Sequence, residues 1–354
     1  MIGKVIERLD ALRGNDDLAS DRTGSTTPQP DAPGAQFWLR GGAVLAFALV
    51  FAVFAATSPL FLTLANLANI VQQSAVLGAL GFGLTAVLIG GGADSIKGGL
   101  DLSIAANMGL CAAAHAVALR AGVSSAGAVG LALTAGVTIG ALNAFAVLGL
   151  RILPLLATLT TMNLCAGLEL VLTQNTSVPA TSPLLAFLIG EGASGIPHLA
   201  TALLAVAVLV TLLVHYTPFG LRLRACGEDA QAARAAGLNV RAYAAASYLL
   251  GGFAAALAAL ASSALLSGSS PGAGENLLAV VAAALLGVVF SRRMVPTMPG
   301  TLLAVLFIGV ISNGFQLDNV SSYWVNGVEG ALILFVVSTT ALLRRRHLGT
   351  HAHD

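Results

Sequence analysis

The segment Asn69–Gly91 reads NIVQQSAVLGALGFGLTAVLIGG and contains no charged side chain. A helix that crosses the hydrocarbon core of a bilayer needs about 20 mostly apolar residues, and this segment has that length. The rest of the chain has a similar character: 56% of its 354 residues are hydrophobic and 9% are charged, against about 25% charged residues in soluble domains. Because such a small number of charges cannot cover a surface that faces water, the apolar excess must face lipid.

Comparable segments recur along the chain, and the expected fold class is an all-α integral membrane protein with about ten transmembrane helices. Backbone groups in lipid must be hydrogen-bonded within the protein, and no segment alternates as the strands of a membrane barrel do. The expected spans are Phe37–Thr57, Asn69–Gly91, Asp101–Leu119, Ala126–Leu148, Leu155–Thr173, Pro197–Tyr216, Tyr243–Leu266, Asn276–Phe290, Pro299–Gln316 and Asn326–Leu343.

The distribution of Lys and Arg gives the orientation, because these residues favour the cytoplasmic side. With ten spans and a cytoplasmic N-terminus, every Lys and Arg except Arg120 lies inside. Both termini are then cytoplasmic, and the protein is placed in the bacterial cytoplasmic (inner) membrane. The expected domains are a polar, disordered tail at 1–36, a transmembrane domain at 37–343 and a C-terminal tail at 344–354.

The long inner loop at 217–242 is the most informative connection. From Thr217 to Val240 it reads TPFGLRLRACGEDAQAARAAGLNV. Acidic residues precede an Ala-rich turn that Gly237 closes, which predicts a short cytoplasmic helix. From these residues alone, the helix could be an ordinary surface helix or the place that a soluble motor grips.

This loop resembles the inner loop of ribose-type (monosaccharide) ABC importer permeases through Thr217, Phe219, Gly220, Ala232, Ala233, Arg234, Gly237, Asn239 and Val240. Three other stretches resemble that family in the same order: Gly98–Ser103, Leu153–Leu172 and Gly309–Gly330. Together they cover roughly Asn66 to Leu343. The chain departs from the family at Gly90–Lys97 and at Leu286–Arg293, where the family has a Gly-rich loop.

The resemblance implies a permease subunit that translocates a monosaccharide or a similar small polar solute. Its inner loop would be the coupling helix that docks on an ATPase subunit. The implied coupling residues are Thr217, Phe219, Gly220, Glu228, Ala233, Arg234, Gly237 and Asn239. The implied partners are the ABC ATPase, a periplasmic sugar-binding protein, membrane lipid and a second permease copy or paralogue, with no nucleic acid.

The chain itself carries no phosphate-binding loop, since its only lysines, Lys4 and Lys97, do not follow the required glycines. We therefore expect a transport subunit without an ATPase motif of its own, without a metal site and without a cofactor, and ATP-Mg would bind to the partner subunit. Cys111, Cys165 and Cys226 are expected to be buried or inert thiols.

A neutral, hydroxyl-rich solute requires amide and hydroxyl partners. The candidates for the translocation path are Asp101, Ser103, Asn107, Thr158, Asn163 and Asn313, with Asn143 and Thr161 as further polar positions. The alternative for Asp101 is an N-cap of the third span, and for the amides and hydroxyls it is hydrogen bonding between helices. Glu169, Glu275, Glu329, His115 and His215 are expected at the membrane interfaces, and Gly81, Gly83, Gly136 and Gly140 at close helix contacts.

Two other classes of protein stay open from the sequence. Asp101 and Glu169 could serve an ion-coupled secondary transporter, although no inverted repeat is found. A membrane enzyme or scaffold is disfavoured because no reactive side chains cluster in the sequence. Within the permease interpretation, branched-chain amino acids or nucleosides are the alternative substrates.

Overall fold

The computed structural model describes residues 33–91, 99–192, 195–272 and 276–321, together with Trp324, Gly327, Val328, Gly330, Ala331 and Leu334. The chain divides into two units, Met1–Trp38 and Leu39–Asp354. The predicted N-terminal tail lies outside the described residues up to residue 32, and the C-terminal tail lies outside them entirely. Glu275, Glu329 and most of the predicted span Asn326–Leu343 also lie outside them.

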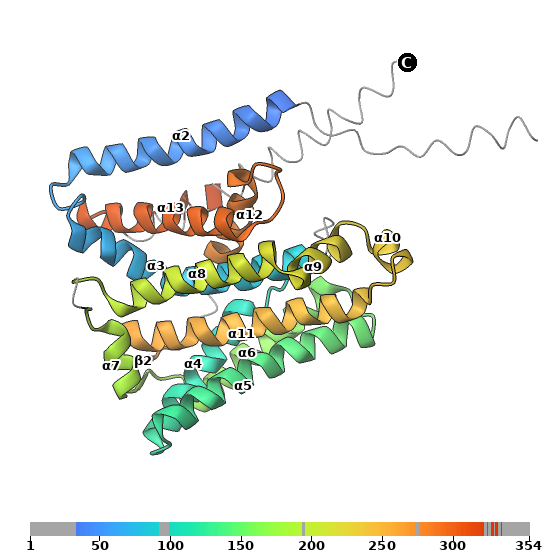
Figure 1. Cartoon of the computed structure of the whole chain (residues 1–354). Helices are drawn as coiled ribbons and strands as arrows, with labels where there is room; N and C mark the ends of the chain where they lie inside the picture. The colour runs from blue at the N-terminus through green and yellow to red at the C-terminus, as the bar shows by residue number, and fades with distance from the viewer. Residues whose placement is uncertain are drawn as a thin grey trace, which may run out of the picture. The chain divides into compact units, whose positions relative to one another are not determined.

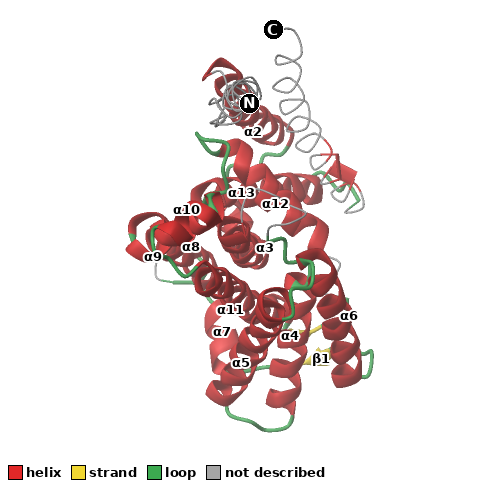
Figure 2. Cartoon of the chain, turned by 90° about the vertical axis from the view of Figure 1, so that its right-hand side faces the viewer, coloured by secondary structure: helices red, strands yellow, loops and turns green. Residues whose placement is uncertain are grey.

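Helices form most of the described part of the chain (Figures 1 and 2). In chain order they are α2 Pro33–Thr57, α3 Leu64–Gly91, α4 Ile104–Arg120, α5 Ser125–Ala144 with the π-turn η1 Phe145–Gly149, α6 Pro154–Thr173, α7 Pro183–Ile189, α8 His198–Tyr216, α9 Pro218–Glu228, α10 Ala230–Ala235, α11 Val240–Leu266, α12 Leu277–Phe290 and α13 Met298–Leu317. The two short strands, β1 Val178–Pro179 and β2 Gly268–Ser269, pair antiparallel and join the connection after α6 to the one after α11.

Six of the described helices are long and apolar enough to cross a membrane: α3, α5 with η1, α6, α8, α11 and α13. Shorter apolar helices cover Gly41–Thr57, Ile104–Arg120 and Leu277–Phe290. Each of these helices coincides with a predicted span. The expected total of ten depends on residues that are not described, so it stays a prediction.

Several boundaries differ from the prediction because local capping overrides the average hydropathy. Helix α3 begins at Leu64 rather than Asn69, and α11 begins at Val240 rather than Tyr243. The inner loop at 217–242 is therefore mostly helical. The connection between α6 and α8 contains a helix that was not predicted, α7, whose N-cap Ser182 accepts a hydrogen bond from the Leu185 amide.

Helices α3 and α11 form the centre of the described fold. Helix α3 packs against α8, α11, α12 and α13, and α11 also packs against α4 and α5. Within its most apolar window, α3 is 83% buried, whereas α6 and α8 are 28% buried. The apolar residues of α6 and α8 thus remain mostly uncovered, as expected for helices that face lipid.

Small residues allow the central helices to approach closely, as predicted for Gly136 and Gly140. A Cβ atom at Gly136 would overlap the carbonyl oxygen of Gly252 on α11, and one at Gly140 would overlap that of Tyr248. Such close contacts replace the hydrophobic driving force that is missing between helices in lipid. The α5–α11 contact holds both helices around the polar residues described next.

Candidate functional site: a buried polar cluster and the inner-loop helices

A polar cluster lies where the chain enters α4. The Asp101 carboxylate is 2% exposed, and its Oδ1 accepts hydrogen bonds from the Ser103 amide (2.9 Å) and hydroxyl (2.7 Å). The Asn143 amide group on α5 donates to Asp101 Oδ1 (3.2 Å) and to Ser103 Oγ (2.8 Å). The carboxylate therefore fastens the beginning of α4 to the end of α5.

Asp101 is not at the N-cap position of the third span, although its carboxylate does accept a hydrogen bond from the Ser103 amide. Ser103 is the N-cap residue of α4, and its side chain makes no capping hydrogen bond. Asp101 lies two residues earlier and holds Ser103 itself. Its role is to fix a stretch of non-helical backbone.

This non-helical stretch lies deep in the bundle. A Cβ atom on Gly251, near the middle of α11, would be 3.9 Å from Asp101 Oδ2, and one on Gly99 would meet the backbone of Val87 on α3. Irregular backbone at membrane depth is tolerated only where protein or water surrounds it. The segment Gly99–Ser103 is such a case, enclosed by α3, α5 and α11.

Two further candidates lie beside this cluster and make contacts between elements. Asn107 donates to the Gly136 carbonyl on α5 (3.2 Å). The Thr158 hydroxyl on α6 lies 2.9 Å from the Pro154 carbonyl and 3.4 Å from that of Leu100. Both side chains are at most 2% exposed. These contacts agree with the alternative to a path-lining role, which is hydrogen bonding between elements of the chain.

The remaining candidates do not join the cluster. Asn163 is exposed on α6 and donates to the Leu159 carbonyl of its own helix (2.9 Å). Asn313 on α13 exchanges two hydrogen bonds with Asn66 (2.9 and 3.0 Å). Asn66 is near the start of α3 and Val87 near its end, so about 30 Å of helix separates this amide pair from Asp101. The predicted path residues therefore belong to separate places.

Two ionisable residues that were expected to be solvated at the membrane interfaces are buried inside the protein. Glu169 on α6 is 3% exposed and His115 on α4 is fully buried. The carboxylate of Glu169 fills the space that Gly109 leaves, because a Cβ there would be 2.5 Å from Glu169 Oε2. An ionisable residue beside a glycine of a neighbouring helix cannot be recognised before the helices are paired.

Tyr248 on α11 was missed by sequence reasoning. It is 2% exposed, and no hydrogen-bond partner of its hydroxyl is found among the described residues. Burying a hydroxyl without a partner is costly. The only signal in the sequence was the presence of a tyrosine within an Ala- and Gly-rich span.

Near the start of α11, the inner-loop helices begin with a tight junction. Thr217 ends α8 and caps α9, accepting a hydrogen bond from the Gly220 amide (3.3 Å). Gly220 lies against the backbone of Val214 so closely that a Cβ would overlap it. The Phe219 and Tyr243 rings are 5.8 Å apart. The predicted coupling residues Thr217, Phe219 and Gly220 thus hold α8, α9 and α11 together.

Helix α10 is the short helix that the Ala-rich turn predicted. Asp229 caps it by accepting hydrogen bonds from the amides of Gln231 (2.8 Å) and Ala232 (2.9 Å). Gly237 ends it with φ +81°, and Asn239 caps α11 through the Ala242 amide (3.2 Å).

The other coupling candidates divide into buried and exposed residues. Ala233 is buried, whereas Glu228 and Arg234 are exposed. The exposed charges at the end of α9 and on α10 can contact a soluble protein, while the buried Ala233 fixes α10 to the rest of the chain.

The three thiols are free and buried, as predicted. Cys226 lies on α9, and burial raises the pKa of its thiol. The thiolate is the reactive form of cysteine, so a raised pKa agrees with the expectation of a packing residue.

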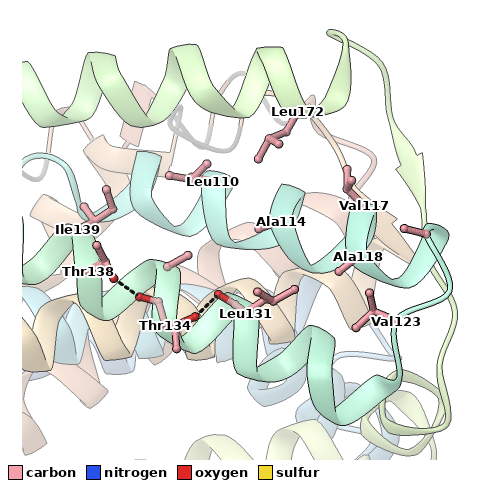
Figure 3. A pocket seen from close by; sticks show the side chains of 12 residues that line it. Leu110, Ala114, Val117, Ala118, Val123, Leu131, Thr134, Thr138, Ile139 and Leu172 are labelled. Carbon is pink, nitrogen blue, oxygen red and sulfur yellow. Dashed lines mark hydrogen bonds between the residues drawn. The ribbon is translucent and has the colours of Figure 1, made fainter.

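An apolar groove of about 560 Å³ lies between α4, α5 and α6 (Figure 3). Leu110, Val117, Leu131 and Leu172 line it. The hydroxyls of Thr134 and Thr138 donate to carbonyls of their own helix (2.9 and 2.6 Å). The groove therefore offers no free donor to a hydroxyl-rich solute, and its chemistry matches an acyl chain of lipid.

Residues 66–337 match the family described as branched-chain amino acid transport system / permease component. The ribose import permease protein RbsC of Bacillus subtilis is 32% identical over 84% of this chain and 91% of its own length. That of Escherichia coli K12 is 30% identical over 83% of this chain and 91% of its own length.

The D-allose transport system permease protein AlsC of Escherichia coli K12 is 29% identical over 88% of this chain and 94% of its own length. Among solved structures, an inward-facing metal-chelate type ABC transporter gives a TM-score of 0.48 at 15% identity, covering 84% of this chain and 99% of its own.

Proposed function

This chain belongs to the permease-component family of branched-chain amino acid transport systems, and we propose that it is the membrane-spanning permease subunit of a bacterial ABC importer for a monosaccharide or a similar small polar solute. The observation that carries this proposal is the similarity to ribose import permeases along most of both chains. The apolar helices agree with a multi-pass protein of the inner membrane.

The proposed partners follow from the role of a permease. A separate ATPase subunit would bind ATP-Mg, a periplasmic binding protein would deliver the solute, and a second permease copy or paralogue would complete the pathway. No triad of His, Cys, Asp or Glu that could hold a metal ion occurs among the described residues. The energy for transport would enter through the ATPase.

Helices α9 and α10 are the proposed docking place of that ATPase. Arg234 and Glu228 are exposed there, while Ala233 is buried and α9 is held by the Thr217–Gly220 junction. A docked motor that moves α10 would pull on α9, and α9 on α8 and α11. These contacts favour a helix that transmits movement to the membrane-spanning helices over an independent surface helix.

The polar cluster around Asp101 is proposed to keep the non-helical segment Gly99–Ser103 in place beside the path. Its hydrogen bonds are directed inside the chain, to Ser103 and Asn143. The proposed role is thus to hold the elements that surround the path, without contacting the solute, for Asp101, Ser103, Asn107 and Thr158. A role for Asn163 would need a partner on the exposed face of α6.

The test is reconstitution with the neighbouring gene products in nanodiscs, followed by an ATPase assay. We expect an ATP-binding subunit to co-purify and its activity to rise with a binding protein that is loaded with a monosaccharide. Stimulation by leucine- or nucleoside-loaded protein instead would change the substrate class. Uptake by the chain alone on an ion gradient would contradict the ABC assignment and favour a secondary transporter.

A further inference from the structure

His215 occupies the last turn of α8, at the point where α8, α9 and α13 meet. The Arg224 guanidinium of α9 places Nη2 at 2.8 Å from His215 Nδ1. On the other side of the ring, the backbone amide of Met298 lies 3.1 Å from His215 Nε2. A single imidazole thus bridges the inner-loop helix α9 and the first residue of α13.

The chemistry of these contacts makes them compete. A guanidinium and a backbone N–H are both donors without an acceptor. A neutral imidazole has one N–H and one acceptor nitrogen, and a protonated one has no acceptor. The ring must therefore be neutral here, and it can accept a hydrogen bond from only one of its two neighbours at a time.

Each tautomer of His215 leaves one donor without its hydrogen-bond acceptor: Arg224 of α9 in one case and the Met298 amide of α13 in the other. If Nε2 accepts from Met298, the proton is on Nδ1 and faces Arg224, which has to withdraw. If Nδ1 accepts from Arg224, the Met298 amide loses its acceptor. That amide belongs to the first turn of α13, where no intrahelical partner exists, and the N-cap Thr297 serves Gly300 instead (3.2 Å).

The contacts around His215 would transmit either change of hydrogen-bond partner to the neighbouring helices. Helix α9 cannot shift alone, because Gly220 abuts Val214 and Leu223 is fully buried. The start of α13 is fixed to α12, since a Cβ at Gly300 would overlap the carbonyl of Gly287. A change of hydrogen-bond partner at His215 therefore links the α8–α9 pair to the α12–α13 pair.

We propose that His215 is a positioning residue that exchanges one hydrogen bond between Arg224 and Met298, so that α9 and the start of α13 move in alternation. The exchange itself follows from the contacts of the ring. Its use during transport rests on the proposed function, in which a motor moves α10 and α9.

The exchange is tested on the purified chain in nanodiscs by selective ¹⁵N-methionine labelling, since the chain has five methionines. The Met298 amide signal is assigned by its loss in Met298→Leu. His215→Gln places an oxygen near the position of Nε2 and His215→Asn near that of Nδ1. We expect the Met298 amide to stay protected in His215→Gln and to exchange with solvent about fivefold faster in His215→Asn.

Arg224→Gln is expected to change the exchange rate of the Met298 amide in the opposite direction. Without the charged competitor, Met298 keeps the acceptor, and its amide should exchange more slowly than in the unaltered chain. The matched control is His198→Gln at the first residue of the same helix, where the ring contacts Phe187 instead (Nδ1 to carbonyl oxygen, 2.9 Å). A Met298 amide that exchanges at the same rate in Arg224→Gln as in the unaltered chain, or equally fast in His215→Gln and His215→Asn, would overturn the exchange.

The role in transport is tested in the assembled complex. Both His215 variants should lower the stimulation of ATPase activity by loaded binding protein about tenfold, while His198→Gln should leave it unchanged. Normal stimulation in the His215 variants would overturn the coupling role even if the exchange is found. If no ATPase assembles with the chain, the proposed function fails, and the amide measurements still decide the exchange.

Discussion

At the scale of single residues, Asp101 shows how a carboxylate can serve structure inside a membrane protein. Ionisable groups at membrane depth are costly and are usually suspected of a direct role. Here the oxygens of Asp101 are occupied by Ser103 and Asn143. The carboxylate compensates for the helical hydrogen bonds that Gly99–Ser103 does not make.

Asp101→Ala should therefore destabilise the fold. It leaves the buried amide and hydroxyl of Ser103 without their acceptor, at a cost of about 1–3 kcal/mol for each unpaired group, while Asn143 keeps Ser103 Oγ as an acceptor. We expect a lower Tm in detergent by size-exclusion chromatography after heating. Asn163→Ala is the control, because it removes one amide bonded only to its own helix, and it should leave the Tm nearly the same as that of the unaltered chain. Equal Tm values for the two variants would show that the cluster stabilises nothing.

At the scale of elements, two turns with the same backbone conformation allow the effect of backbone strain to be distinguished from a functional role of the turn after α10. Gly237 has φ +81°, and no atom lies within 4 Å of the position that a Cβ would take there. Gly122, in the turn after α4, has φ +82° with the same open surroundings. Both turns favour glycine for the same backbone reason. They differ in location, since only Gly237 adjoins the helix proposed to meet the ATPase.

Gly237→Ala and Gly122→Ala should lower stability similarly, by roughly 1 kcal/mol each. Only Gly237→Ala is expected to reduce the stimulation of ATPase activity by loaded binding protein, since the end of α10 would shift. The measurement compares melting curves with ATPase stimulation for the two variants. A loss of stimulation in both would point to general destabilisation instead of a special role for α10.

At the scale of the whole molecule, the chain is organised by a contrast in burial. Helix α3 is enclosed by other helices, while α6 and α8 keep apolar side chains uncovered. The loops that the charge asymmetry assigns to opposite sides are also distinct in structure: β1, β2 and α7 lie in the outer connections, and α9 and α10 in the inner one. The orientation itself stays a prediction.

Single cysteines at Glu191 and Glu228 test that orientation. Both positions are exposed, and the three native cysteines are buried, so the background is low. In intact spheroplasts a membrane-impermeant maleimide should label Glu191→Cys and spare Glu228→Cys, and lysis should expose the second. The reverse pattern would invert the topology, and labelling of both would place the two loops on one side.

The fold class, the positions of most spans and the family could be predicted from the amino-acid sequence, because these follow from local quantities. Apolar length decides what can cross a bilayer, and turn chemistry predicted α10 from Asp229 and Gly237. The motifs in order along the chain indicated the permease family, which residues 66–337 match.

Only the tertiary structure decided which polar residues meet. Asp101 pairs with Asn143 across 42 positions, and Asn313 with Asn66 across 247. Glu169 and His115 looked interfacial by their place along a helix, but the helices that cover them come from elsewhere in the chain. Burial and hydrogen bonding depend on which helix faces pack together, and in a chain this uniformly apolar the helix faces carry almost no amphipathic signal to reveal that packing.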